Sequence, residues 1–156
     1  MAKPLPTYLR CVVCGRENHR GLNLRFLADG PVIRSELTFS EDLCGFKGVA
    51  HGGIITAVLD EAMGWAAAYN SRRICVAAEL TVRFVKPVLA SDRVHVAARM
   101  ERDRRRVIEA TAEMLDGGGE ALVRASGKFM PLESAHAREV DAYLDYEGCE
   151  KGLFVY

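Results

Sequence analysis

The feature of this chain that most limits its possible folds is one long apolar segment, residues 54–69. The segment is almost entirely apolar or small, contains no proline and is too short to span a bilayer, which together predict one buried helix. Four segments rich in Val, Ile, Thr and Phe follow it and predict strands, at 74–85, 93–101, 106–115 and 120–130. Because an antiparallel meander with one apolar face needs a cover, we expect the helix to pack on that face in an α+β fold.

Shorter patterns predict the rest of the chain. Two alternating runs at 22–26 and 32–39, divided by Asp29-Gly30-Pro31, predict a hairpin. Residues 40–48 have no periodicity and predict a loop, and residues 135–146 predict a short helix. A chain of 156 residues buries one core, so we expect a single domain over 1–156, with a core of about 11–131 and a C-terminal extension at 132–156.

The composition argues against several functional classes. The 21 lysines and arginines balance the 21 aspartates and glutamates, so the field that holds nucleic acid non-specifically is missing. No apolar stretch is long enough for a membrane span or a signal peptide, which favours a cytoplasmic protein. Five cysteines, an odd number, fit free thiols in a reducing compartment better than a disulfide framework.

Candidate chemistry gathers where the predicted helix starts. Gly52 and Gly53 leave backbone N–H groups unobstructed at the positive end of the helix dipole, where an oxyanion can be held, as acyl transfer requires. Asp60 falls outside the apolar arc of the helix, among small side chains, where a carboxylate suits a base or nucleophile beside a substrate. The alternative is that Asp60 and Glu61 mark a solvated helix edge and that the glycines only make a turn.

Longer motifs carry a family resemblance. The string HGGIITAVLDEAMG at 51–64, followed by AELTVRFVKPV at 78–88, resembles the phenylacetate-pathway type of hotdog acyl-CoA thioesterase, within the 4-hydroxybenzoyl-CoA thioesterase superfamily. The opening CVVCGRENHRGL at 11–22 is similar to the N-terminal signature of one branch of that group. The likeness runs from about Cys11 to Met130. It implies a helix wrapped by a curved antiparallel sheet, two such units pairing into a continuous sheet, and active sites at the subunit interface.

The resemblance also implies roles for single residues. Asp60, nine positions after His51, would be the nucleophile or general base, and the Gly52 amide would polarise the thioester carbonyl. His51 would orient that loop or help to hold the thioester, and Gly53 would contact the substrate. The implied reaction is hydrolysis of an acyl-CoA thioester to a free acid and CoA, without a metal or redox cofactor, by a homodimer or homotetramer.

Two departures from the family pattern leave other functions open. Gly45 lies where many relatives carry an amide side chain, and Ala77 where many carry a serine or threonine. Glu79, two residues after Ala77 and therefore expected on the same strand face, offers a second carboxylate, although Asp60 ranks ahead of it. A hotdog protein that binds acyl-CoA without hydrolysing it is the main alternative, and hydratase or dehydratase chemistry is a third.

Two further clusters have competing interpretations. Cys11, Cys14 and His19 offer three zinc ligands, which Cys44 would complete, but the absence of a second knuckle favours reduced thiols over bound zinc. A basic run suits the phosphates of CoA and equally suits a solvated hairpin tip, with Lys86 a weaker candidate for the same contact. The basic run comprises Arg102, Arg104, Arg105 and Arg106.

Overall fold

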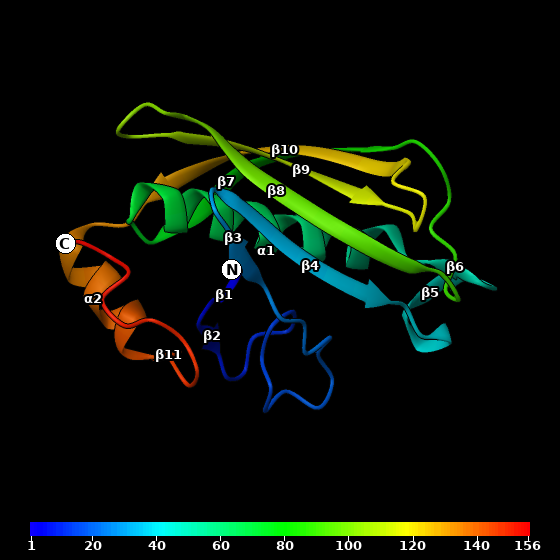
Figure 1. Ribbon diagram of the computed structural model, residues 1–156, viewed down its shortest axis with the longest axis horizontal. Helices are drawn as coiled ribbons and strands as arrows, with labels where there is room; N and C mark the ends of the chain where they lie inside the picture. Colours follow the sequence, from blue (N-terminus) through cyan, green and yellow to red (C-terminus); the bar gives the residue numbers. More distant parts are fainter.

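The computed structural model describes all residues, from Met1 to Tyr156. One long helix, α1 (Gly52–Ser71), lies in the concave side of a seven-stranded antiparallel sheet that arches over it (Figure 1). The predicted hotdog arrangement, α+β with one central helix, is confirmed. Across the sheet the strands are β1 (Lys3–Pro4), β3 (Leu27–Asp29), β4 (Val32–Thr38), β8 (Arg93–Asp103), β9 (Ile108–Leu115), β10 (Ala121–Pro131) and β7 (Cys75–Phe84).

Smaller elements join the two ends of the chain and lead into the helix. β2 (Thr7–Tyr8) pairs with β11 (Leu144–Asp145), so the N-terminal segment is hydrogen-bonded to the C-terminal one. A 3-10 turn, η1 (Glu41–Leu43), and the strand pair β5 (Cys44–Phe46) and β6 (Val49–Ala50) lie just before α1. The region expected to be a loop at 40–48 therefore has short secondary structure of its own.

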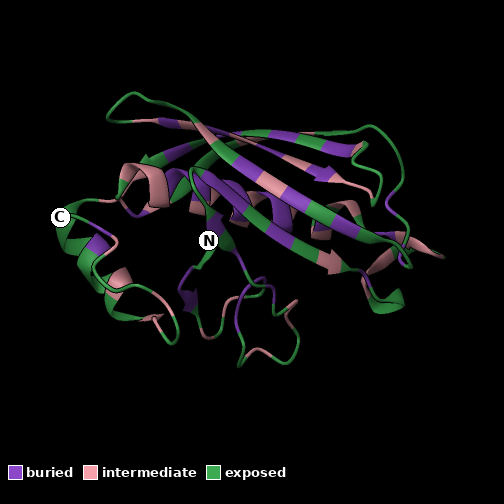
Figure 2. Cartoon of the chain, viewed as in Figure 1, coloured by how far each residue is buried: buried purple, intermediate pink, exposed green.

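The core forms where α1 packs against the sheet. Alternate residues of β8, β9 and β10 are buried, as the alternating colours along these strands show (Figure 2). The strands thus present one apolar face to the helix, which the period-2 pattern predicts. The residues of α1 buried in this contact are Ile55, Val58, Leu59, Ala62, Met63, Ala66, Ala67 and Ala68.

Two expectations about strand placement were wrong. The first arm of the hairpin is β3, not residues 22–26, because the N–H groups of Leu22 and Leu24 bond to the carbonyls of Val12 and Val13 in the N-terminal loop. The four strands after the helix do not form one meander, because only β8, β9 and β10 are neighbours in chain order. Residues 85–92 cross from β7 to β8 past the start of α1, where hydrogen bonds tie Val88 and Ala90 to residues 48–50.

The C-terminal extension packs on the far end of the helix. It contains α2 (Ser134–Ala142), where a short helix was predicted, and α2 lies beyond the C-terminal end of α1 (Figure 1). Ala137 and Phe154 form a small second core with Ala68 and Ile74. Neither helix combines the length and apolar character needed to cross a bilayer.

Candidate active site

His51 and the two glycines shape the start of α1. His51 is the N-cap residue, and its Nδ1 accepts a hydrogen bond of 2.9 Å from the N–H of Gly53. The N–H of Gly53 is therefore already bonded to protein, contrary to the expectation of two free amides. The N–H of Gly52 has no hydrogen-bond acceptor within the helix, and no backbone carbonyl of the surrounding loops accepts from it. It is the one amide of the glycine pair that remains free to hold an oxyanion.

Close packing fixes the orientation of His51. A Cβ on Gly45 would lie 3.0 Å from Cδ2 of the imidazole, so the histidine ring occupies the space that a side chain at position 45 would need. The absence of a side chain at position 45 therefore lets the His51 ring pack close to the backbone there. This contact and the hydrogen bond to Gly53 support the expected role of His51 in orienting the loop.

A shallow groove of about 450 Å³ opens beside Gly52. The ring of Phe84, at the end of β7, covers one side of it, and a Cβ on Gly52 would approach Cζ of that ring to 3.2 Å. Lys86 lies on the wall of the groove and forms an ion pair of 2.6 Å with Glu120. The groove is lined by Gly45, Phe46, Val49, Ala50, His51, Gly52, Ile55, Phe84, Val85, Lys86, Pro87 and Val88.

Asp60 lies on the wall of a second, mostly apolar cavity of about 330 Å³. Its side chain is half-buried and has neither a hydrogen bond nor an ion pair with any protein group. Burial, and to a smaller extent the neighbouring charge of Glu61, raise the pKa of Asp60. The other lining residues are Tyr8, Cys11, Cys14, Glu61, Gly64, Trp65, Ala68, Ile74, Cys75, Ala77, Phe129, Val140, Leu144 and Phe154.

A β-bulge separates Ala77 and Glu79, which were expected on one strand face. Phe129 pairs with Ala77 and Lys128 pairs with Glu79, so the register between β10 and β7 shifts by one residue at Ala78. Ala77 therefore faces the Asp60 cavity, whereas Glu79 lies on the outer face in an ion pair of 2.8 Å with Lys128. The expectation that Glu79 shares a strand face with Ala77 was therefore wrong.

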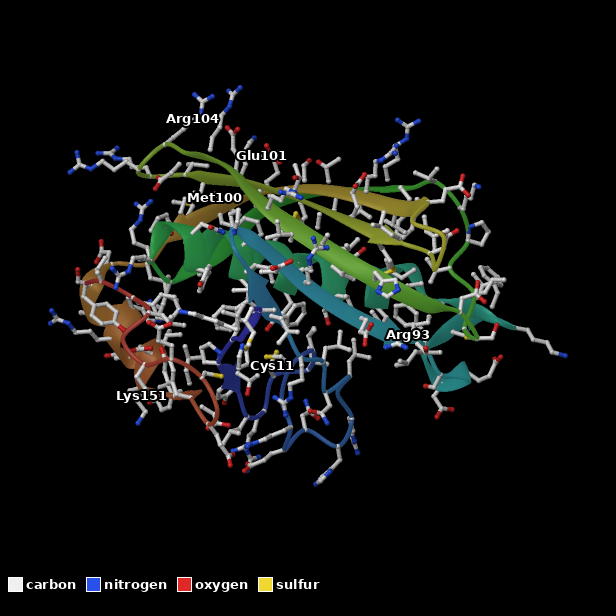
Figure 3. All side chains as sticks on the ribbon, viewed as in Figure 1. Cys11, Arg93, Met100, Glu101, Arg104 and Lys151 are labelled. Carbon is white, nitrogen blue, oxygen red and sulfur yellow. The ribbon has the colours of Figure 1, made fainter.

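The basic run lies at the exposed turn between β8 and β9. Arg104 forms an ion pair of 3.2 Å with Glu109, and Arg105 accepts a hydrogen bond of 2.7 Å from Arg73 through its carbonyl oxygen. Arg73 follows the C-terminal end of α1, so the basic run lies at the opposite end of the helix from Gly52. Figure 3 shows Arg104 on the far side of the sheet from Cys11.

Glu61, Cys11 and Cys14 form a polar cluster beside Asp60 that periodicity alone did not predict as a site. The Glu61 carboxylate accepts a hydrogen bond of 3.2 Å from Nε1 of Trp65, and its two oxygens lie 3.7 and 3.8 Å from Sγ of Cys11. Burial raises the pKa of Glu61 to about 7. A hydrogen bond from Cys14 lowers the pKa of the Cys11 thiol to about 5, and the same contact raises the pKa of Cys14. Only the CxxC spacing hinted at this cluster in the sequence.

Gly52 and Asp60 of one chain are too far apart to act on the same atom. They are eight residues apart on one helix, which at 1.5 Å per residue separates them by about 12 Å. Reacting groups must come within about 3.5 Å of each other. Both hollows nevertheless border β7, because Phe84 lies over Gly52 at one end of the strand and Ala77 faces Asp60 near the other.

β7 itself is an open edge of the sheet. It is hydrogen-bonded to β10 on one side only, over its length from Cys75 to Phe84. Apolar side chains are exposed along it, with 48% of Val76 and 52% of Phe84 accessible. A long edge strand of this kind is a ready surface for pairing with another strand.

Comparison with known proteins relates the central part of the chain to thioesterases. Residues 47–123 match the family model of the thioesterase superfamily, a region that includes all of α1, β7, β8 and β9. An uncharacterized protein of Schizosaccharomyces pombe is 32% identical over 96 residues, which are 58% of this chain and 55% of that protein. The chain thus spans about half the length of this curated relative.

Solved structures share the fold at low sequence identity. A thioesterase superfamily protein superposes with a TM-score of 0.73 and 21% identity, over 78% of this chain and 60% of that one. The E. coli PaaI protein of the phenylacetic acid degradation operon superposes with a TM-score of 0.66 and 18% identity, over 72% of this chain and 81% of that one. A Streptococcus mutans protein, crystallised with bound acetyl CoA, superposes with a TM-score of 0.65 and 14% identity, over 70% of this chain and 89% of that one. The chain therefore has the hotdog fold, and its residues 47–123 match the model of the thioesterase superfamily.

Proposed function

We propose that the protein hydrolyses an acyl-CoA thioester to a free carboxylic acid and CoA. The observation that carries the proposal is the half-buried Asp60 carboxylate, which has no protein partner and lies on the wall of an apolar cavity. A desolvated carboxylate without a partner is costly unless it has a function, and a base beside a bound substrate is such a function. The family match and the acetyl CoA bound to the Streptococcus mutans neighbour support the choice of thioester.

Asp60 and Gly52 would divide the chemistry between them. The Asp60 carboxylate takes a proton from water, which attacks the thioester carbonyl carbon, or it attacks that carbon itself. The free N–H of Gly52 stabilises the negative charge that develops on the carbonyl oxygen. The carbon–sulfur bond then breaks, and CoA leaves as a thiolate that takes up a proton. In the route through direct attack, this step leaves an anhydride between the acyl group and Asp60, which water hydrolyses to the free acid and the Asp60 carboxylate.

The complete site would form between two copies of the chain. Because Gly52 and Asp60 of one chain are about 12 Å apart along α1, one thioester needs each residue from a different copy. Antiparallel pairing of two β7 edges would bring the Phe84 end of one strand to the Ala77 end of the other, which joins the Gly52 groove to the Asp60 cavity. A homodimer with two sites follows, or a tetramer built from such dimers.

The same pairing gives the basic run a role. In one chain the exposed run Arg104–Arg106 lies at the C-terminal end of α1, far from Gly52. In the antiparallel pair that end of one chain approaches the Gly52 groove of the other, where Lys86 already lies. Guanidinium groups there would contact the phosphates of CoA. Neutralising the run should raise KM for acyl-CoA more than it lowers kcat.

The proposal is tested with Asp60→Asn, which keeps the shape of the side chain and removes its basicity. Purified protein is incubated with aryl, short-chain and long-chain acyl-CoAs, and released thiol is measured. We expect the variant to lose about 10²–10⁴-fold in kcat for the substrates that the wild type hydrolyses, with unchanged thermal unfolding. An undiminished rate in the variant would remove the proposed role of Asp60.

Ala77 favours one alternative, a protein that binds acyl-CoA without hydrolysing it. Its methyl group faces the Asp60 cavity, where a hydroxyl would help to position water. In the thiol-release assay, tight binding of acyl-CoA by the wild-type protein without release of thiol would favour this alternative. Product formed from an enoyl-CoA without loss of CoA would instead indicate a hydratase.

A further inference from the structure

The N-terminal loop and the central helix together build a compact set of soft and acidic ligands. The potential ligand atoms of Cys11, Cys14 and Glu61 all lie within 4.8 Å of one another. Cys14 is fully buried and the other two are half-buried, and all three residues line the cavity that also contains Asp60. His19 and Cys44, which the sequence suggested as further ligands, are not part of this group.

The spacing of these atoms suits one tetrahedral metal ion. Zinc binds cysteine sulfur at about 2.3 Å and carboxylate oxygen at about 2.1 Å, which places the two ligand atoms about 3.6 Å apart at a tetrahedral angle. Sγ of Cys11 lies 3.7 and 3.8 Å from the two oxygens of Glu61. The separation of Cys11 and Glu61 therefore matches that of two ligands on one ion, and Sγ of Cys14 lies within 4.8 Å of both.

The loop that carries the cysteines is shaped as a knuckle. The backbone N–H groups of Val13 and Cys14 point at Sγ of Cys11 at 3.3 and 3.5 Å, which supports negative charge on that sulfur. The N–H of Gly15 closes the turn on the carbonyl of Cys11 at 3.0 Å. A Cβ on Gly15 would lie 2.5 Å from the backbone of Cys11, so only glycine allows this turn.

Charge also favours a cation at this place. Glu61 is a half-buried carboxylate, and none of the ion pairs of the protein includes it. Its side-chain contacts are the indole N–H of Trp65 and the sulfur of Cys11. A half-buried carboxylate next to two cysteines, with no cation paired to it, is stabilised by a positive charge, which a divalent cation would supply.

We propose that Cys11, Cys14 and Glu61 bind one thiophilic divalent cation of the zinc class, with a fourth position open to the Asp60 cavity. Both cysteines bind the ion as thiolates, and any proton that a ligand still carries is released to solvent. The ion ties the N-terminal loop to α1 and leaves one coordination position for water or another small donor. The site differs from the sequence expectation of a metal-free pair of thiols, because its third ligand lies 50 residues further along the chain.

Cobalt binding tests the site without any measurement of activity. The full-length protein is reduced, treated with a chelator and titrated with Co²⁺, which reports thiolate and tetrahedral coordination in its absorption spectrum. We expect one cobalt per chain, with thiolate charge-transfer and intense ligand-field bands that added Zn²⁺ removes. Elemental analysis of protein purified under reducing conditions should find about one zinc per chain.

Variants assign the three ligands. Cys11→Ser and Cys14→Ser should remove the thiolate spectrum, and Glu61→Gln should weaken binding by more than the roughly 10–100-fold caused by losing an outer-shell partner. Cys149→Ser is the matched control, because that half-exposed cysteine lies outside the cluster, and it should bind cobalt as the wild type does. Circular dichroism confirms that each variant is folded.

Three outcomes would overturn the site. The first is the absence of cobalt bands in protein whose thiols are shown to be reduced. The second is a spectrum and affinity that Glu61→Gln leaves unchanged, since this would remove the third ligand. The third is recovery of a Cys11–Cys14 disulfide that, after reduction, takes up no metal.

Discussion

Two inactive variants of this protein should restore each other if the site is shared between chains. The first variant is Asp60→Asn, which lacks the base. The second is Gly52→Pro, which lacks the backbone N–H that would hold the oxyanion. Proline suits the first position of a helix, and the extended backbone of His51, with ψ of 130°, suits the residue before a proline. Gly52→Pro should therefore lose about 10²–10³-fold in kcat while the helix still forms.

The size of the rescue follows from the geometry. A heterodimer of the two variants contains one site with both native residues and one site with neither. Random reassociation of equal amounts makes half of the dimers heterodimers, so the mixture should show about one quarter of the wild-type rate per chain. Heterodimers purified with two different tags should show about one half. Both values lie at least about tenfold above the rate of either parent.

The assay is thiol release from the best acyl-CoA substrate, after refolding or co-expression of the two chains. A matched control mixes Asp60→Asn with the double variant Asp60→Asn/Gly52→Pro, which cannot form an intact site. Gly52→Ala keeps the N–H and adds only a Cβ that meets the flexible ring of Phe84 at 3.2 Å, so it should remain active. If verified heterodimers were as inactive as their parents, the division of the site between chains would be refuted.

Further predictions concern stability and the outer face. Phe129→Ala, at a side chain only 1% exposed, should lower the free energy of unfolding by about 3–5 kcal/mol in urea titration. Gly127→Ala should cost about 1–3 kcal/mol by the same method, because its Cβ would lie 2.7 Å from the Phe129 ring and 3.0 Å from Leu80. Glu79→Gln should cost less than about 1 kcal/mol, since its ion pair with Lys128 is exposed, and a loss of turnover as large as that of Asp60→Asn would contradict its outward position. Zinc at a hundredfold excess over its Kd should add about 2.7 kcal/mol to the free energy of unfolding, and a chelator should reverse this gain; the absence of any metal effect would count against the cation site.

Sequence patterns predicted the helices and strands whose formation depends mainly on neighbouring residues. The apolar run at 54–69 gave the central helix almost to its ends, because a helix buried on most of its surface needs apolar residues throughout. The strands β8, β9 and β10 followed from their content of Val, Ile, Thr and Phe, which favour strands. The position of β7 at the far edge did not follow, because it depends on the path of residues 85–92 past the start of the helix.

The site shows the same division between local and distant effects. The sequence motif pointed to Asp60 and Gly52, which lie where the local helix pattern puts them. It misplaced Glu79, because one extra residue at Ala78 reverses the faces of the strand and leaves no mark in the composition. The contact between Glu61 and Cys11 could not be predicted from the sequence, because only the folded chain brings residues 50 positions apart together.

The end wall of the Asp60 cavity has a consequence for how substrate preference can change. Val140, Leu144 and Phe154 come from the C-terminal extension, outside the residues 47–123 that the family shares. Under the proposed function, the C-terminal extension would limit the length of the acyl chain that fits the cavity, although it carries none of the reacting groups. Substitutions in the extension can then change which acyl-CoAs are hydrolysed while the reacting residues stay unchanged. Exchanging the extension between homologues should transfer substrate selectivity without loss of turnover.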